Sequence, residues 1–256
     1  MIHFEQVTKA YGGNPAVLRC LNFQVRPGEF VSLIGRSGCG KSTTLSLINR
    51  LIEPTSGTIR VDGQDIATTN PVALRRRIGF VFQGIGLFPH LTIAENIGIT
   101  PRLLGWPAVE IKTRVRELLD LVRLPPTCES RLPRELSGGE QQRIGLARAL
   151  AARPRIMLMD EPFGALDPLV RDELAADYSV IHRQLRLTTV LVTHDMTEAL
   201  LLSNKIIVQH AGGIVQIGTP QKLLSAPADE VVAALIESPR RRIGQLTRLL
   251  EQGSML

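Results

Sequence analysis

Apolar and polar positions near the N-terminus alternate, which predicts short strands with one buried face. The almost wholly apolar run 30–34 follows a Pro-Gly turn and predicts a buried strand. Apolar residues then recur at helical spacing over 42–51 and predict a helix. The segment 57–61, with a turn at 62–63, predicts the edge of a hairpin, and the run 78–82 predicts a central strand.

The pattern changes from about 84 to 152, where strand signals vanish and helical periodicity takes over. Five apolar residues there are spaced as one face of a helix that ends before a Pro-Pro pair: Val109, Val115, Leu118, Leu119 and Val122. We therefore expect a helical lobe inserted between two parts of an α/β sheet.

Strand patterns return in the last third of the chain. The runs 156–159 and 189–192 flank a predicted helix over 170–187. A strand–helix–strand unit of this kind is typical of a parallel sheet with right-handed crossovers. The runs 206–209 and 213–216 predict a final hairpin, and helical periodicity follows them.

The bulk composition narrows the class of protein. The chain has 256 residues, of which 44% are hydrophobic, enough for a substantial core. No run of about 18 apolar residues occurs, so we expect no membrane-spanning helix. The N-terminus lacks the basic start and apolar segment of a signal peptide, which favours a cytosolic chain. The three cysteines form no C-x-x-C pair, so we expect neither a disulfide framework nor a zinc site.

The charge balance is basic, with a formal net charge of +6. Arginines cluster at 75–77 and 240–242, which raises nucleic acid or an anionic membrane as a partner. Neither cluster is interleaved with aromatic residues, which make up only 4% of the chain. We interpret both clusters as solvated faces, with membrane proximity as the second interpretation and no nucleic-acid partner.

The most informative segment has the G-x-x-x-x-G-K-S form of a phosphate-binding loop and lies between a predicted strand and a predicted helix. Its residues, with the next one included, are Gly35, Arg36, Ser37, Gly38, Cys39, Gly40, Lys41, Ser42 and Thr43. Glycines let backbone N–H groups converge on an anion, and the helix N-terminus adds unpaired N–H groups. Lys41 would then reach the β- and γ-phosphates, and Ser42 would ligate magnesium. A plain glycine turn is the alternative, and we interpret Cys39 as a small tolerated residue rather than an activated thiol.

Two further segments carry groups suited to phosphate chemistry. The strand that precedes Asp160 ends in two acids. A carboxylate at such a position holds magnesium, usually through water, and we assign this role to Asp160. Glu161 would polarise an attacking water, although an acidic turn after a strand is the alternative. Ser137 would cap a helix whose N–H groups at Gly138 and Gly139 form a second anion-binding helix start.

In order and spacing, these segments resemble those of ATP-binding-cassette (ABC) ATPases over about residues 2–235. The resemblance is carried by the phosphate loop, Gln83, the Leu-Ser-Gly-Gly-Glu segment at 136–140, the adjacent acids and His194. It implies an α/β fold: a P-loop NTPase mixed-sheet core with an antiparallel β subdomain and an inserted helical subdomain. It also implies an ATPase domain over 1–238, ahead of a short basic helical tail over 239–256, with ATP and Mg²⁺ as cofactors.

The resemblance implies roles for single residues. Tyr11 would stack on the adenine, although packing on its own glycine turn is the alternative. Gln83 would reach magnesium and the attacking water. His194 would contact the γ-phosphate and complete the catalytic site with Glu161.

The resemblance also implies a homodimer. Residues 137–139 would close over ATP held by the opposite subunit, and the loop that ends at Asp167 would cross the dimer interface. The helix that Ser137 caps is separate from the phosphate loop, and its N-terminus needs an anion as a partner. A head-to-tail pairing of two chains is therefore physically reasonable.

The segment 84–96 is similar to that of importers, whose inserted lobe receives a coupling helix from an integral-membrane permease. Residues 49–54, taken with 84–90, are similar to the subfamily that imports quaternary amines and osmoprotectants such as glycine betaine and choline. The resemblance implies an ATPase at the cytoplasmic face of the plasma membrane that works with a permease and an extracytoplasmic solute-binding protein. Many members of that subfamily carry paired regulatory modules beyond the ATPase; this sequence ends at Leu256, so we expect no osmotic gating through such modules.

Three alternatives remain open: an importer of another solute such as an amino acid or sulfonate, a soluble ABC ATPase acting on DNA or ribosomes, and a small-molecule kinase. The short lobe disfavours the second of these, and the Leu-Ser-Gly-Gly segment together with His194 disfavours the third.

Overall fold

The computed structural model describes residues 1–237, 239 and 241 and contains two β-sheets. The first is antiparallel, in the order β2-β1-β4-β5, and is formed by β1 (Ile2–Lys9), β2 (Leu18–Val25), β4 (Ser56–Val61) and β5 (Gln64–Asp65). Alternating residues of β1 and β2 face the core, where the rings of Phe4 and Phe23 stack with centroids 4.3 Å apart. The alternation in the sequence therefore correctly predicts an antiparallel β subdomain.

The second sheet has the order β10-β9-β3-β8-β7-β6 and is parallel except for β10. Its strands are β3 (Phe30–Ile34), β6 (Ile78–Val81), β7 (Ile156–Asp160), β8 (Thr188–Thr193), β9 (Lys205–His210) and β10 (Gly213–Gly218). The predicted strands are present, and the mixed sheet is confirmed. The expectation that 78–82 is central is wrong, because β6 lies at an edge of this sheet. Its run is apolar because α2 (Pro71–Arg77) and α5 (Gly138–Leu150) pack against it.

Helices cover both faces of the six-stranded sheet. On one face, α1 (Lys41–Ile48) packs between this sheet and the antiparallel one. On the other, α5 and α6 (Pro168–Gln184) enclose a core that includes the fully buried Tyr178. Helix α1 ends three residues before the predicted boundary, since the backbone of Arg50 has φ +48°, outside the helical region, and the following Leu51 is exposed.

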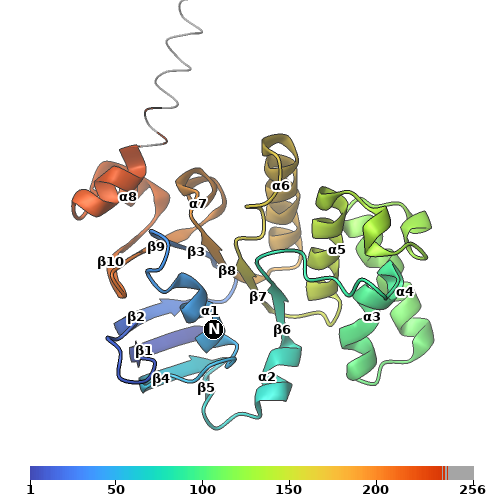
Figure 1. The fold of residues 1–256 in the computed structure, drawn as a ribbon, viewed down its shortest axis with the longest axis horizontal. Helices are drawn as coiled ribbons and strands as arrows, with labels where there is room; N and C mark the ends of the chain where they lie inside the picture. The colour runs from blue at the N-terminus through green and yellow to red at the C-terminus, as the bar shows by residue number, and fades with distance from the viewer. Residues whose placement is uncertain (238, 240, 242–256) are drawn as a thin grey trace, which may run out of the picture.

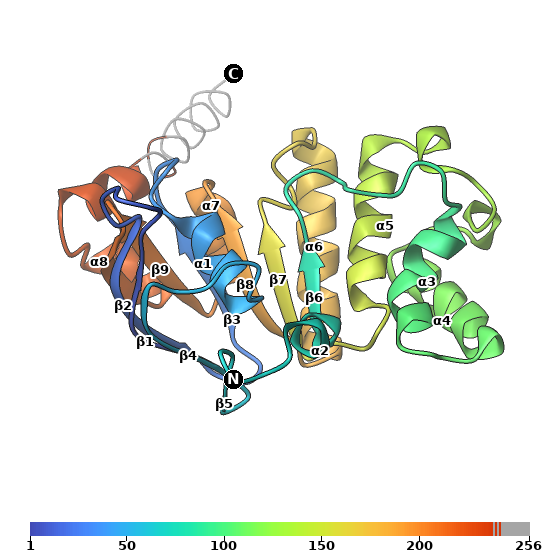
Figure 2. The ribbon, with the colours of Figure 1, turned by 60° about the horizontal axis from the view of Figure 1, so that its bottom comes forward.

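The helical lobe lies between β6 and β7 in the chain and consists of α3 (Ile93–Leu103), α4 (Ala108–Leu121), the short 3₁₀ helices Pro126–Cys128 and Pro133–Glu135, and α5. Figures 1 and 2 show the lobe and the antiparallel sheet at opposite ends of the six-stranded sheet. Four of the five residues expected on one face of α4 are buried, but Val109 is 79% exposed. It lies in the first turn of α4.

The last helices that the structure describes are α7 (Met196–Leu202), α8 (Pro220–Ser225) and a further helix that begins at residue 230 and includes 231–237. The proposed basic tail over 239–256 lies almost entirely outside the described residues, as do two of the three arginines at 240–242. Across the part of the chain that the structure describes, no helix has the length and apolar character needed to cross a membrane.

Candidate functional site

The phosphate loop connects β3 to α1, and its glycines are needed where they stand. Gly40 has φ +101°, and a Cβ there would collide with the side chain of Leu18. A Cβ on Gly35 would collide with the carbonyl oxygen of Gln209 on β9. Only glycine fits these positions without strain or overlap, so the backbone N–H groups of the loop remain free to converge on an anion.

The lysine of the loop is buried and lies against the loop backbone. The ammonium group of Lys41 donates to the carbonyl oxygens of Gly35 at 2.8 Å and Arg36 at 3.3 Å. No carboxylate pairs with it among the described residues, so its positive charge is available to phosphate. Burial raises the pKa of Cys39, against the electrostatic effect of Lys41, which favours our interpretation of this thiol as inert.

The end of β7 brings an acid beside the start of α1. The hydroxyl of Ser42 donates to Oδ1 of Asp160 at 3.1 Å. Burial raises the pKa of Asp160, and the neighbouring charge of Glu161 adds to the effect. A cation between the hydroxyl and the carboxylate would offset both costs. No group of three or more His, Cys, Asp and Glu side chains suited to a metal occurs among the described residues. This donor set suits magnesium, which takes few protein ligands and completes its shell with water and substrate phosphate.

Three side chains meet beside this point, at the carboxyl ends of β6, β7 and β8. Oε2 of Glu161 lies 3.2 Å from Nδ1 of His194 and accepts a long 3.5 Å hydrogen bond from Nε2 of Gln83. Glu161 has φ +45°, which is costly for a non-glycine residue. Its N–H donates to the carbonyl oxygen of Val192 at 2.9 Å, which ties this turn to β8. The side chain of Glu161 is only 23% exposed, whereas that of His194 is 61% exposed. A protected carboxylate with two polar neighbours can act as a general base toward a water.

The second helix start is well capped but lies apart from the phosphate loop of its own chain. Ser137 accepts from the N–H of Glu140 at 3.3 Å, and the Glu140 carboxylate accepts from the N–H of Ser137 at 2.8 Å. These hydrogen bonds lower the pKa of Glu140. Gly139 is required because a Cβ there would lie 2.7 Å from Cγ1 of Val170, whereas Gly138 is open. In both ribbon views β6 and β7 separate α5 from α1 (Figures 1 and 2).

Two further predicted residues lie at the margins of the cluster. Tyr11 is 45% exposed in the loop after β1, and the ammonium group of Lys9 lies 4.8 Å from its ring centroid. Asp167 caps α6 by accepting from the N–H of Val170 at 3.2 Å.

Sequence reasoning missed Arg171, which joins two loops of the site. Its Nη2 lies 3.3 Å from the carbonyl oxygens of Gly164 and Leu166, in the loop that ends at Asp167. Its Nη1 lies 3.7 Å from the carboxylate of Asp195, the residue after His194. Its Nε is buried without a hydrogen-bond partner among the described residues. The sequence signal for this residue is its spacing: Arg171 lies one helical turn after Asp167, the cap of α6, and so projects from the same end of the helix.

Comparison with known proteins agrees with this geometry. A family model described as "ABC transporter" matches residues 18–164. The Bacillus subtilis glycine betaine/carnitine/choline transport ATP-binding protein OpuCA is 52% identical over 240 residues, 94% of this chain. The Escherichia coli glycine betaine uptake system ATP-binding protein YehX is 48% identical over 232 residues, 91% of this chain and 75% of YehX. The chain spans 63% of the length of OpuCA.

The fold comparison gives the same family. The dimeric structure of the bacterial ABC transporter cassette MJ0796 has a TM-score of 0.78 and 35% sequence identity, covering 86% of this chain and 99% of that one. A second dimeric structure of MJ0796, bound to ADP and phosphate after hydrolysis, matches equally well, with a TM-score of 0.78 and 34% identity. With a family match over more than half of the chain and a relative 48% identical over most of both lengths, this chain belongs to the ATP-binding proteins of the ABC transporter family.

Proposed function

We propose that this chain is the ATP-hydrolysing subunit of an ABC importer for quaternary amines and osmoprotectants such as glycine betaine and choline. The observation that carries the enzymatic part is the convergence of Gln83, Glu161 and His194 beside the phosphate loop. The solute class rests on relatives, because these residues do not touch the transported molecule. OpuCA and YehX are named for glycine betaine transport, and a Salmonella typhimurium relative 46% identical is named OsmV, an osmoprotectant import ATP-binding protein.

In the proposed site, the backbone N–H groups of the phosphate loop and Lys41 bind the phosphates of ATP. Tyr11, exposed after β1, offers its ring to the adenine. Ser42, Asp160 and Gln83 would hold Mg²⁺, which neutralises phosphate charge when bound. The hydroxyl of Ser42 and Oδ1 of Asp160, two of these three ligands, are held 3.1 Å apart by their hydrogen bond.

Hydrolysis requires a base, and we assign Glu161. Its carboxylate would accept a proton from the water that attacks the γ-phosphate. Gln83 and His194 orient this carboxylate through their contacts with Oε2. Because the side chain of His194 is largely exposed, its ring remains available to contact the γ-phosphate.

The complete site would need two chains. Ser137, Gly138 and Gly139 start a helix that β6 and β7 separate from α1 of the same chain. In a head-to-tail homodimer this helix start would cover the γ-phosphate bound by the partner, and Asp167 would lie at the interface. Both MJ0796 structures above are dimeric, which supports the arrangement.

A permease would dock beside Gln83. A groove of about 360 Å³ there is lined by four exposed apolar side chains, Leu51, Phe82, Phe88 and Leu103. Burial lowers the pKa of Arg148, which borders the groove and donates to the carbonyl oxygen of Gly86 at 2.8 Å. Exposed apolar surface of this kind marks an interaction site. We assign it to a cytoplasmic helix of the permease. In this proposal the chain would lie at the cytoplasmic face of the membrane and would work with a solute-binding protein.

The test is solute uptake by the assembled transporter. We expect ATP-dependent accumulation of radiolabelled choline or glycine betaine in vesicles that contain this chain with its permease and binding protein, and no accumulation with Glu161→Gln. A relative from Thermobifida fusca that is 42% identical is named for spermidine and putrescine import, so labelled putrescine is the competing substrate. Uptake of putrescine without choline or glycine betaine would overturn the solute class and leave the ATPase role intact. Wild-type ATP turnover by Glu161→Gln would overturn the assignment of the base.

A further inference from the structure

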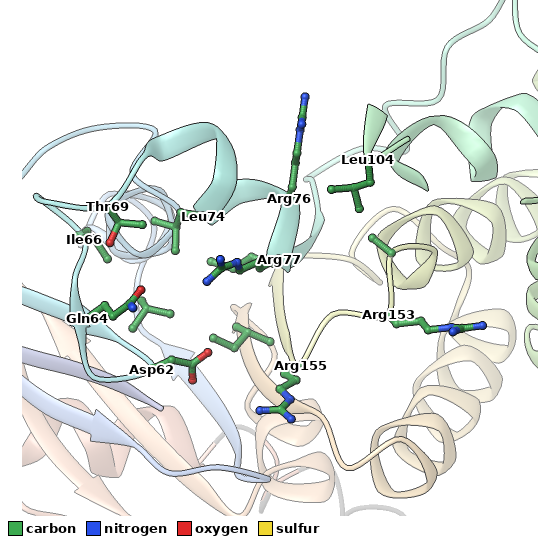
Figure 3. Close-up of a pocket in the computed structure, with 14 residues that line it drawn as sticks. Asp62, Gln64, Ile66, Thr69, Leu74, Arg76, Arg77, Leu104, Arg153 and Arg155 are labelled. Carbon is green, nitrogen blue, oxygen red and sulfur yellow. The ribbon is translucent and has the colours of Figure 1, made fainter. Parts of the chain in front are cut away.

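The cavity drawn in Figure 3 has a volume of about 390 Å³ and lies where β6 and β7 begin. Its arginines are exposed or half-buried, and the side chains of Arg76, Arg77 and Arg153 point in three different directions. Charged groups that spread apart in this way do not converge on one ligand, so we assign none to this cavity. Buried polar groups that do converge lie beneath the phosphate loop.

A buried glutamine on β9 lies against the phosphate loop. Gln209 is 1% exposed and follows Val208, which pairs with Ile34, the last residue of β3. This register places Gln209 beside Gly35, where the loop begins, and a Cβ on Gly35 would collide with the carbonyl oxygen of Gln209. At the other end of the loop, a Cβ on Gly40 would lie 3.5 Å from Nε2 of Gln209. A residue from a distant part of the sequence therefore packs against both ends of the loop.

Hydrogen bonds connect this glutamine to the backbone of the loop. Nε2 of Gln209 donates to Oγ1 of Thr44 at 3.4 Å, and the Thr44 hydroxyl donates to the carbonyl oxygen of Gly40 at 3.1 Å. The N–H of Thr44 donates to the same carbonyl oxygen at 2.9 Å. All three residues are buried, and hydrogen bonds arranged in series in a buried site strengthen one another.

The carbonyl of Gly40 determines where the next N–H points. The peptide bond between Gly40 and Lys41 is trans, so its planar group directs the N–H opposite to the C=O. The carbonyl points along α1, toward Thr44. The N–H of Lys41 therefore points out of the helix at its N-terminus, the end at which a phosphate loop binds its anion. Holding the carbonyl in place thus holds one phosphate donor in place.

The amide of Gln209 is costly to the fold. Its Oε1 is buried and has no hydrogen-bond partner within the part of the chain that the structure describes. A buried acceptor left unpaired destabilises a protein, whereas an apolar side chain of similar length avoids this cost. A role in packing alone therefore does not explain a glutamine here, and the hydrogen bond to Thr44 is what the amide contributes.

We propose that Gln209 is a positioning residue for ATP binding. Through Thr44 it holds the carbonyl of Gly40, and with it the N–H of Lys41, in the orientation that a phosphate requires. This inference rests on the proposed binding of ATP phosphates by the loop and adds to it a residue from β9. Because the contacts of Gln209 are with the loop rather than with Glu161, it acts on the affinity for ATP more than on kcat.

Calorimetry with adenylyl imidodiphosphate and Mg²⁺ on the full chain tests the proposal. Gln209→Met removes the amide and keeps an unbranched side chain of similar length. We expect the Kd to rise about two- to fivefold, the effect of one neutral hydrogen bond. The kcat at saturating ATP should stay within about twofold of wild type. The free energy of unfolding in urea should be equal to or higher than that of wild type, because the unpaired oxygen is gone.

The matched control is a second buried glutamine, on the neighbouring strand β10. Gln216 is 8% exposed and makes hydrogen bonds of 2.9 Å with the carbonyl oxygen of Ala226 and 2.8 Å with the N–H of Ala228. Gln216→Met should therefore lower the free energy of unfolding and leave the Kd for the nucleotide unchanged. A role in stability alone would give the same ranking of the two variants in both measurements.

The partner residue gives an independent test. Thr44→Val should weaken nucleotide binding at least as much as Gln209→Met, whereas Thr44→Ser keeps the hydroxyl and should bind like wild type. The double variant Gln209→Met with Thr44→Val should bind no more weakly than Thr44→Val alone, because the two side chains act through one hydrogen bond.

An unchanged Kd in Gln209→Met or in Thr44→Val overturns the proposal, as does a loss of affinity that Gln216→Met reproduces. A fall in kcat that exceeds the rise in Kd also overturns it. If Gln209→Met does not fold, the two Thr44 variants decide, and a loss in Thr44→Val that Thr44→Ser does not restore counts against the proposal. None of these results bears on Glu161, whereas a wild-type chain that binds no nucleotide would overturn the proposed function itself.

Discussion

Arg171 offers a sharp test of how the catalytic loops are held. Replacing it with alanine removes two contacts to the loop that ends at Asp167 and one to Asp195, beside His194. All three distances are long, at 3.3, 3.3 and 3.7 Å, and the side chain is 26% exposed. Short hydrogen bonds from a charged group contribute about 1.5–3 kcal/mol each. At these distances and this exposure we expect a combined loss of about 1–2 kcal/mol in the positioning of the two loops.

If that loss appears in the transition state, kcat for ATP hydrolysis by Arg171→Ala should fall about 5- to 30-fold. The KM for ATP should change less than about twofold, because Arg171 does not line the phosphate loop and so contributes little to ground-state binding. Arg171→Lys should recover part of kcat, since an ammonium group can still donate to a loop carbonyl. Arg183→Ala on the same helix is the matched control, because that side chain is exposed at the far end of α6.

The assay is steady-state ATP hydrolysis over a range of ATP concentrations, with thermal unfolding of each variant alongside. A wild-type kcat for Arg171→Ala would refute the positioning role. So would a loss of kcat that is matched by Arg183→Ala or by a general loss of stability.

Three further predictions concern the magnesium ligand Asp160, the phosphate-loop residue Gly40 and the cap residue Glu140. Asp160→Asn should reduce ATP turnover at least about 100-fold, because a magnesium ligand is lost. The same variant should have a higher free energy of unfolding in urea at pH 7. Folding raises the pKa of Asp160, so the fold is more stable with this carboxyl protonated. That contribution to stability is fully present below pH 3.8 and is lost as the pH rises through the raised pKa. Asparagine carries no charge at pH 7 and so avoids this loss. Gly40→Ala should lower the free energy of unfolding in urea by about 2 kcal/mol or more, because φ is +101° and Leu18 blocks the Cβ, and calorimetry should detect no ATP binding. Gly38→Ala, at φ +79° with open space around the Cβ, should lower it by only about 1 kcal/mol. Equal losses in the two variants would contradict this explanation. Glu140→Ala should cost about 0.5–1 kcal/mol at pH 7. Because the pKa of Glu140 is lowered, this contribution is present above 4.5 and should disappear as pH falls through the lowered value; a difference from wild type that persists in strong acid would count against it.

Local sequence signals predicted those parts of the site that depend on neighbouring residues. The loop from Gly35 to Ser42 has its glycines where the backbone needs them, and Ser137 caps α5 together with Glu140 as the Ser-x-x-Glu spacing indicates. The two acids at the end of β7 lie at the carboxyl ends of the parallel strands, where such sheets bind ligands.

Contacts between distant segments were not accessible in the same way. An apolar run such as 78–81 has the same pattern in a central strand and in an edge strand covered by helices, so its position in the sheet could not be predicted. Arg171 looks like an ordinary surface arginine until the loops around Gly164 and Asp195 are brought beside it.

We propose that two chains enclose ATP, each covering the triphosphate bound by the other with Ser137, Gly138 and Gly139. Light scattering on Glu161→Gln tests it most directly, because this variant should bind ATP and Mg²⁺ without turning them over. We expect a particle of twice the 28.1 kDa chain mass at saturating ATP, and a return to the single-chain mass when ATP is removed. A particle of single-chain mass that contains bound ATP would contradict it.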